Sequence, residues 1–271
     1  MFLNSVVLIL QEILEAALLV SVLLVFTRVN GMRAGWVFLG LAAGCVGALI
    51  FSLNMATISE WFDYVGQEVV NASLQYAITL LLALFAFCYG TGRARLKSWM
   101  LTCMILSVTF SLSREGAEIF IYIEGVLSQP PHIRPTLTGA GIGAGIGVSV
   151  GVLLYYGLLW FPGRWVTFCC LLLLAMVAGN MSSQGTLLLT QADWLPPTAT
   201  LWDTGTAIAE NSIPGHLLYA LIGYEATPSL LQAVAYAAGI LLVLASHWLG
   251  RRRAAGTISH HSTPITQTEQ S

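Results

Sequence analysis

Residues 2–27 read FLNSVVLILQEILEAALLVSVLLVFT, an almost unbroken apolar run. An α-helix rises about 1.5 Å per residue, so a run of this length spans the roughly 30 Å hydrocarbon core of a bilayer. Its only charged residues are Glu12 and Glu15. Because the run has no basic start and no obvious small-residue cleavage site, we expect it to remain in the mature protein rather than act as a signal peptide.

Six further apolar runs of similar length follow it, at residues 34–58, 69–90, 98–123, 136–161, 165–190 and 229–249. Hydrophobic residues make up 56% of the 271 and charged residues only 9%, with a mean hydropathy of +0.78. This composition excludes an ordinary soluble domain. The sequence therefore predicts an all-α polytopic membrane protein with seven transmembrane helices in a domain of residues 1–250. Residues 251–271 are expected to form a disordered cytoplasmic tail.

Basic residues fall almost entirely in alternate loops. By the positive-inside rule these loops are cytoplasmic, which predicts an N-terminus outside and a C-terminus inside the cell. Arg134 is the one basic residue expected on the outer side. The longest connection, 191–228, contains an apolar stretch at 213–224 that is too short to cross and predicts an interfacial or re-entrant helix. The residues that set this topology are Arg28, Arg33, Arg93, Arg95, Lys97, Arg164, Arg251, Arg252 and Arg253.

Two apolar runs carry charged side chains, which are costly in a membrane and usually mark a function. Glu12 and Glu15 lie three residues apart, as do Glu115 and Glu118 in the segment SREGAE. Residues at this spacing share one face of a helix. Clustered carboxylates without Cys or His favour a hard cation, but the spacing does not choose among iron, calcium, magnesium, manganese and protons. The five cysteines lack any CxxC spacing and predict no thiolate site.

The two glutamate pairs are expected to meet near the middle of the bilayer. Each lies ~15 Å below the outer end of its predicted helix, and the two helices run in opposite directions. Similar motifs three spans apart predict an inverted repeat of spans one to three and four to six, with the seventh added. Glycines in the run 136–161 have small-xxx-small spacing, which indicates close helix packing.

These residues carry a resemblance to a known family. The Glu-x-x-Glu pair of the first run, the REGAE motif of the fourth and the segment WDTGTAIAENSIPGHLLYALIGYEATPS at 202–229 together resemble the oxidase-dependent iron permeases. That family includes fungal high-affinity iron permeases and bacterial permeases of acid-induced ferrous-iron uptake. The resemblance implies a permease of the plasma or bacterial inner membrane. It also implies ferric iron as transported substrate, a separate extracytoplasmic oxidase or peroxidase as partner, and no permanently bound cofactor.

The family's iron path contains two Arg-Glu-Gly-x-Glu motifs, and only the second is complete here. It reads Arg114, Glu115, Gly116, Ala117, Glu118, whereas in the first Gln11 stands for the arginine and Ile13 for the glycine. The resemblance implies that Glu12, Glu15, Glu115 and Glu118 bind the metal, supported by Arg114 and Gln11. Three outer acids resemble positions that gather iron, although a solvated acidic loop is the alternative: Glu68, Asp203 and Glu225.

Other functions remain open at this point. A carboxylate site is not intrinsically selective, so the cargo is alternatively another divalent cation such as lead or manganese. An intramembrane enzyme would use Glu115 or Glu118 as general base. We expect no enzyme, because the chain has no HExxH motif, no cofactor fingerprint and no serine with a paired membrane histidine.

Overall fold

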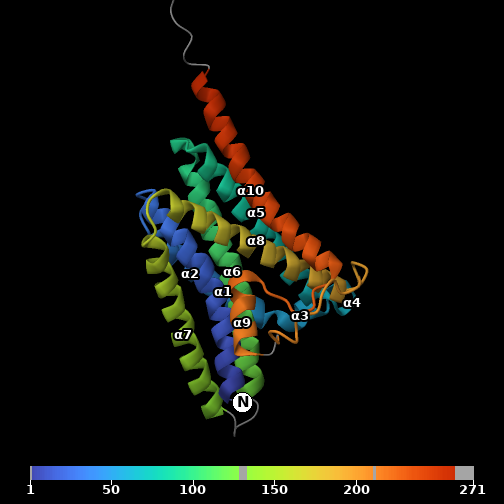
Figure 1. Cartoon of the computed structure of the whole chain (residues 1–271). Helices are drawn as coiled ribbons and strands as arrows, with labels where there is room; N and C mark the ends of the chain where they lie inside the picture. Colours follow the sequence, from blue (N-terminus) through green and yellow to red (C-terminus); the bar gives the residue numbers. More distant parts are fainter. Residues whose placement is uncertain (1, 128–132, 210–211, 260–271) are drawn as a thin grey trace, which may run out of the picture.

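The computed structural model describes residues 2–127, 133–209 and 212–259 (Figure 1). These residues form helices, and within them the only β-type pairing is an isolated bridge between Thr200 and Ser229. The long helices are α1 (Phe2–Val29), α2 (Trp36–Leu53), α5 (Gly66–Thr91), α6 (Lys97–Leu127), α7 (Ile133–Leu159), α8 (Arg164–Gln191) and α10 (Leu230–Ser259). The short ones are α3 (Met55–Ser59), α4 (Trp61–Tyr64), η1 (Ala94–Leu96) and α9 (Ile213–Ile222).

Seven of these helices are long and apolar enough to cross a membrane, which confirms the predicted all-α fold. The second predicted run, 34–58, is interrupted, because α2 ends at Leu53 and Asn54 leaves the helical region with φ −101° and ψ 6°. The seventh run continues beyond 249, as α10 extends to Ser259. The division into a domain of 1–250 and a tail stays a prediction, and residues 260–271 lie outside the described residues.

The helix contacts agree with an inverted repeat. The most extensive contacts join α1 to α7 and α2 to α6, and α5 also packs on α8. Exchanging the first three spans with the next three converts the α1–α7 pair into the α6–α2 pair, as a two-fold relation requires. The seventh span, α10, lies along α5 and α8 (Figure 1).

Glycines set the distance between α1 and α7. A Cβ added at Gly143 would lie 2.5 Å from the Val6 carbonyl oxygen, and one at Gly139 would lie 2.7 Å from that of Phe2. Only glycine allows so close a backbone approach, which is the packing that the small-residue spacing predicts. The sequence of α7 therefore fixes the position of α1 and of its glutamates.

An apolar core fills the half of the bundle beyond the glutamates of α1. Leu18, Val22 and Phe26 of α1 pack there with buried residues of α5, α6 and α8. The ring of Phe26 lies 5.2 Å from that of Phe85 and 4.9 Å from that of Tyr89 between centroids. This half of the bundle is closed by apolar side chains.

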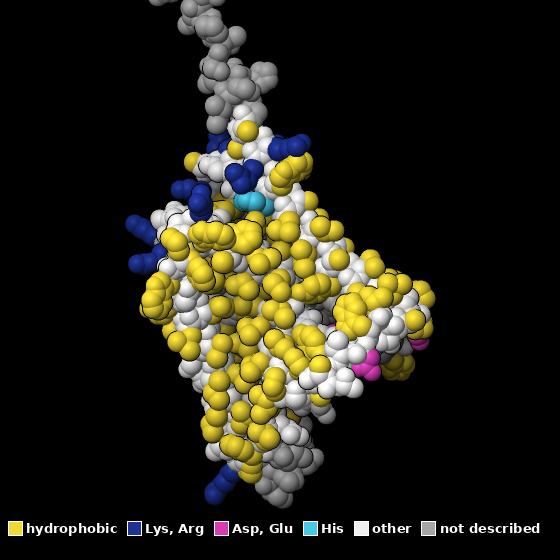
Figure 2. Space-filling view, in the orientation of Figure 1, with side chains coloured by type: hydrophobic (Ala, Val, Ile, Leu, Met, Phe, Trp, Pro, Cys, Tyr) yellow, Lys and Arg dark blue, Asp and Glu magenta, His cyan; other side chains and the backbone are white. Residues whose placement is uncertain are grey.

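Basic side chains gather at one end of the molecule (Figure 2). Arg28 lies in the last turn of α1, Lys97 begins α6 and Arg164 begins α8, so the connected helix ends meet on one side. Arg134 lies in the first turn of α7, at the opposite end of the molecule from these basic residues. It is the one basic residue that the sequence predicts on the outer side. We propose that the basic end is cytoplasmic.

Cysteine labelling tests this orientation. In a background without the five native cysteines, Thr206→Cys is expected to react with an impermeant maleimide added to intact cells, and Ala94→Cys only after permeabilisation. Both positions are exposed, so a difference in labelling reports sidedness. The opposite pattern would reverse the proposed topology.

Candidate metal centre

Helices α1 and α6 bring the two glutamate pairs together. Glu12, Glu15 and Glu115 are 6%, 4% and 1% exposed, whereas the side chain of Glu118 is 40% exposed. One carboxylate oxygen from each of Glu12, Glu115 and Glu118 lies within 4.8 Å of the other two. We call these three residues and Glu15 the carboxylate group. The spacing of three residues in each helix places both carboxylates on the same face, where the other helix packs.

Arg114 holds the carboxylate group together. Its Nη2 atom lies 3.1 Å from Glu115 Oε2 and 3.8 Å from Glu15 Oε2, and its Nε atom lies 3.4 Å from Glu118 Oε1. One guanidinium thus contacts three of the four carboxylates. With all four ionised, the formal charge of the group and Arg114 is −3, so the centre attracts cations.

Two glutamines that the sequence analysis missed position Arg114. Gln184 Oε1 of α8 accepts hydrogen bonds from Arg114 Nη1 at 2.9 Å and from Gln75 Nε2 of α5 at 2.8 Å. Both amides are buried. Each is a polar residue within an apolar run, which is the signal that points to it, but an uncharged amide stands out less in such a run than a glutamate does.

Several oxygens of the carboxylate group lack hydrogen-bond donors. Among the described residues, Glu12 Oε2, Glu15 Oε1 and Glu115 Oε1 are buried and accept no hydrogen bond, and the other oxygens of Glu15 and Glu115 face only Arg114. Buried polar atoms without partners are uncommon because each is costly. A cation bound between the helices would satisfy these lone pairs.

The other predicted residues lie outside the carboxylate group. Gln11 Oε1 is 3.0 Å from His216 Nδ1 of α9. Asp203 Oδ1 accepts the Gly205 N–H at 2.8 Å in an exposed loop, and Glu68 lies half-buried in the first turn of α5. Both Glu225 oxygens lie 2.8 Å from Gln232 Nε2.

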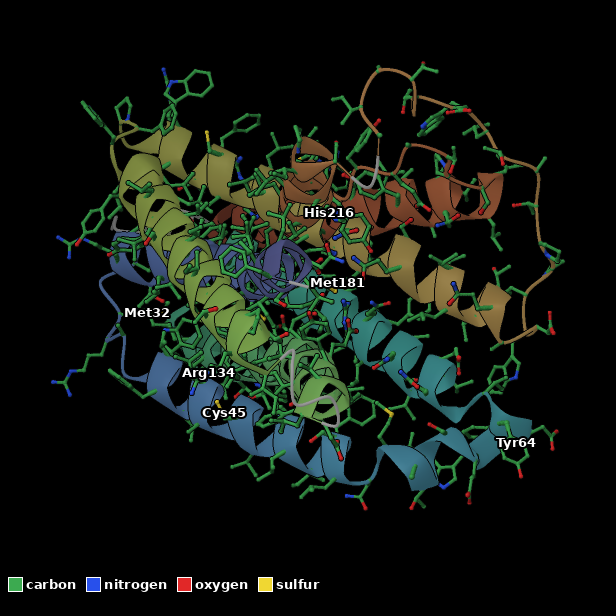
Figure 3. All side chains as sticks on the ribbon, turned by 90° about the horizontal axis from the view of Figure 1, so that it is seen from below. Met32, Cys45, Tyr64, Arg134, Met181 and His216 are labelled. Carbon is green, nitrogen blue, oxygen red and sulfur yellow. The ribbon has the colours of Figure 1, made fainter. Side chains whose placement is uncertain are left out.

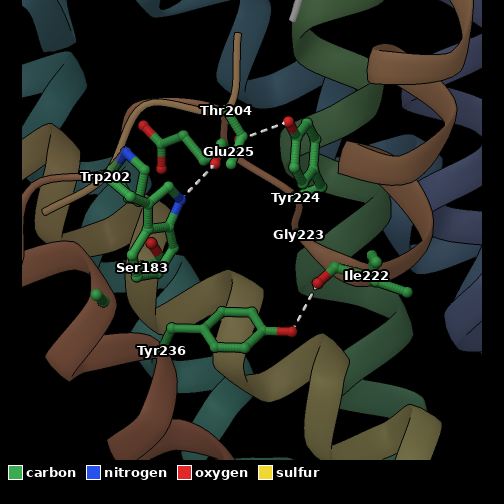
Figure 4. A pocket seen from close by; sticks show the side chains of 10 residues that line it. Ser183, Trp202, Thr204, Ile222, Gly223, Tyr224, Glu225 and Tyr236 are labelled. Atoms are coloured by element: carbon green, nitrogen blue, oxygen red, sulfur yellow. Dashed lines mark hydrogen bonds between the residues drawn. The ribbon is translucent and has the colours of Figure 1, made fainter. Parts of the chain in front are cut away.

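Two cavities lie beside α9 and the segment that follows it. One, of about 380 Å³, is lined by Gln11, Leu187, Gly215, His216, Tyr219, Tyr224 and Glu225. The other, of about 280 Å³, shares Tyr224 and Glu225 and is walled by Trp202 and Tyr236 (Figure 4). The segment 222–225 lines these cavities and is held by two hydrogen bonds. The Tyr236 hydroxyl donates to the Ile222 carbonyl at 2.6 Å, and Trp202 Nε1 donates to the Glu225 carbonyl at 3.4 Å.

The short helix α9 forms where the apolar stretch 213–224 was predicted. The Ser212 hydroxyl accepts the Gly215 N–H at 3.1 Å, which caps the first turn, and Pro214 lies at its start. Gly223, with φ 68°, adopts the left-handed conformation that ends the helix. These signals hold His216 and Tyr219 against α1 and the first cavity.

Seven apolar helices that enclose a buried group of ionisable side chains have the architecture of a polytopic membrane transporter. The chain belongs to the Iron permease FTR1 family, whose model matches residues 2–255. This match confirms the resemblance and, at the level of the family, identifies an integral membrane permease rather than an enzyme. The comparisons with curated proteins and with solved structures gave no significant match.

Proposed function

We propose that this protein carries iron across the cell membrane by passing the ion through the carboxylate group of Glu12, Glu15, Glu115 and Glu118. The observation that carries the proposal is the convergence of buried carboxylate oxygens from two helices within 4.8 Å, several without a donor. Carboxylate oxygens are suitable ligands for a hard cation. Iron is the transported substrate, and the family relation supports its choice.

The arrangement of cavities and core supports a route for the ion. The cavity of about 380 Å³ is lined by Gln11, the residue that directly precedes Glu12. Beyond the carboxylate group the apolar core around Phe26 blocks the way to the basic end. We infer that iron enters from outside, waits at the carboxylates, and crosses when the core residues move apart.

We propose ferric iron as the cargo, supplied by a separate oxidase or peroxidase outside the membrane. Fe³⁺ is a hard cation whose charge matches the formal −3 of the centre with Arg114 included. The sequence contains no haem, copper or flavin motif, so oxidation is assigned to a partner. Another divalent cation such as lead or manganese is the alternative cargo.

Uptake into proteoliposomes tests this function. The purified chain is reconstituted and supplied in parallel with ferric iron as a soluble chelate, ferrous iron under reducing conditions, manganese and lead. We expect iron to accumulate, and ferric iron to do so without a reductant. If manganese or lead were taken up faster than either iron species, that metal and not iron would be the cargo.

The substitution Gln11→Arg restores the family's first arginine and is expected to weaken iron binding. The new charge would lie beside Glu12, where repulsion of the bound cation is expected to cost ~1.4 kcal/mol or more, about tenfold in affinity. Gln11→Met, which is uncharged and similar in length, measures the effect of losing the amide alone, so that the effect of the added charge can be separated from it. Iron-binding affinity of the purified variants is the measurement. Equal affinities for wild type and Gln11→Arg would show that residue 11 lies outside the electrostatic reach of the site.

A further inference from the structure

His216 lines the cavity of about 380 Å³ that also contains Gln11, the residue before Glu12. It projects from α9 towards α1 and lies near the centre of the bundle when the molecule is viewed from below (Figure 3). A cavity of this volume admits a hydrated metal ion. Four other side chains in the cavity wall have an oxygen or nitrogen atom that could bind a metal: Gln11, Tyr219, Tyr224 and Glu225.

The contact with Gln11 determines which imidazole nitrogen can bind a metal. Gln11 Oε1 accepts hydrogen bonds, so its contact with His216 Nδ1 at 3.0 Å is a hydrogen bond in the tautomer that carries the proton on Nδ1. In the neutral ring this leaves Nε2 with its lone pair as a ligand atom. An N–H bonded to an oxygen is the usual arrangement for a metal-binding histidine, because it fixes the ring and its tautomer.

Glu225 contributes a positioned carboxylate to the same cavity. Gln232, at the start of α10, places its Nε2 atom 2.8 Å from both Glu225 oxygens, while its own Oε1 accepts the Ser229 N–H at 2.9 Å. The Ser229 N–H therefore orients the Gln232 amide, and this amide in turn orients the Glu225 carboxylate.

Tyr219 connects this cavity with the carboxylate group. Its phenol lines the cavity beside His216, and the charges of Glu15 and Glu12 act on it directly. The charge of Glu225 also acts on this phenol. An ion in the cavity is thus within electrostatic reach of the carboxylate group.

We propose that His216 and Glu225 form a second cation site, which holds a transition-metal ion before it passes to the carboxylate group. The order of the two sites rests on the proposed transport function. Imidazole nitrogen with carboxylate oxygen suits iron and similar transition metals, whereas magnesium and calcium prefer oxygen alone. The site therefore selects against the abundant alkaline-earth ions.

The proposal also explains the departure at Gln11. An arginine at this position would place its positive charge against His216 and oppose a cation in the cavity. Gln11 instead supplies the oxygen that orients the imidazole. Gln11 and His216 thus belong to one arrangement, formed by residues 205 positions apart.

Iron binding and X-ray absorption of the purified full-length chain test this proposal. Ferrous iron is added in the absence of oxygen to protein from which the purification tag has been removed. In every sample His260 and His261 are replaced by alanine, and wild type here means this background without further substitutions. We expect wild type to bind two ions and to show outer-shell scattering from an imidazole ring. His216→Asn is expected to bind one ion, without the imidazole signal. The control His247→Asn removes a histidine of α10 that does not line the cavity, and is expected to behave as wild type.

A fourth variant separates this site from the proposed transport site. Glu115→Gln is expected to lose the other ion while keeping the imidazole signal, because Glu115 does not line the cavity. Millimolar magnesium should leave the imidazole signal unchanged. An imidazole signal that persists in His216→Asn, or is absent from wild type, would overturn the cavity site. Loss of iron from Glu115→Gln alone would still support the carboxylate group.

Discussion

Replacement of any one of Glu12, Glu15, Glu115 or Glu118 by alanine is expected to abolish iron uptake while the protein remains in the membrane. Each ionised carboxylate attracts a cation held at the centre with one negative charge. Removal of a charge within ~4 Å of a multivalent ion, even at an effective dielectric constant of ~20, costs more than ~3 kcal/mol. Uptake should therefore fall on the order of 100-fold or more.

Glutamine variants make this prediction sharper. Glu115→Gln keeps the size of a side chain that is only 1% exposed, so it removes the charge without leaving a cavity. Glu60→Gln is the matched control, because Glu60 is an exposed glutamate that follows α3 and lies outside the carboxylate group. The measurement is the initial rate of iron uptake, normalised to the amount of inserted protein. Normal uptake by correctly inserted Glu115→Gln would remove this residue from the path.

The second large effect is expected from Gly143→Leu. A Cβ at this position would lie 2.5 Å from the Val6 carbonyl oxygen and 3.1 Å from the Leu10 backbone nitrogen, so α7 must move away from α1. Neither partner atom belongs to a flexible side chain. Such overpacking costs about 3 kcal/mol, and it displaces the helix that carries Glu12 and Glu15. We expect less folded protein and loss of uptake together.

Gly141→Leu is a control on the same helix. Nothing lies within 4 Å of a Cβ added at Gly141, which is exposed on the outer face of α7. This variant is expected to keep the wild-type melting temperature in detergent to within a few degrees. The melting curve, followed by tryptophan fluorescence, separates the two variants. Equal stability of Gly143→Leu and Gly141→Leu would contradict the close packing of α1 on α7.

Hydropathy and helical spacing were sufficient to predict the seven helices and the pairing of glutamates within α1 and α6. These features depend on residues close together in the sequence, and the membrane restricts a spanning segment to a helix. The end of α2 at Leu53 was missed because the residues after Asn54 are also apolar, so hydropathy alone does not reveal the change of direction.

The contacts that orient the site could not be predicted in the same way. Gln75 and Gln184 are 109 positions apart, and Gln184 and Arg114 are 70 apart. Such pairs depend on which helix faces lie together, which one sequence without homologues does not specify. Asp203 and Glu225 likewise appeared equivalent as outer acids. In the fold, only Glu225 lines a cavity that leads to Gln11.

Anomalous X-ray diffraction at the iron absorption edge, from crystals equilibrated with iron, tests the central claim most directly. The account predicts an iron peak between α1 and α6, coordinated by carboxylate oxygens of Glu12, Glu115 and Glu118. The peak should disappear in Glu115→Gln crystals prepared in the same way. Iron bound at full occupancy elsewhere, with no peak among these carboxylates, would contradict the account.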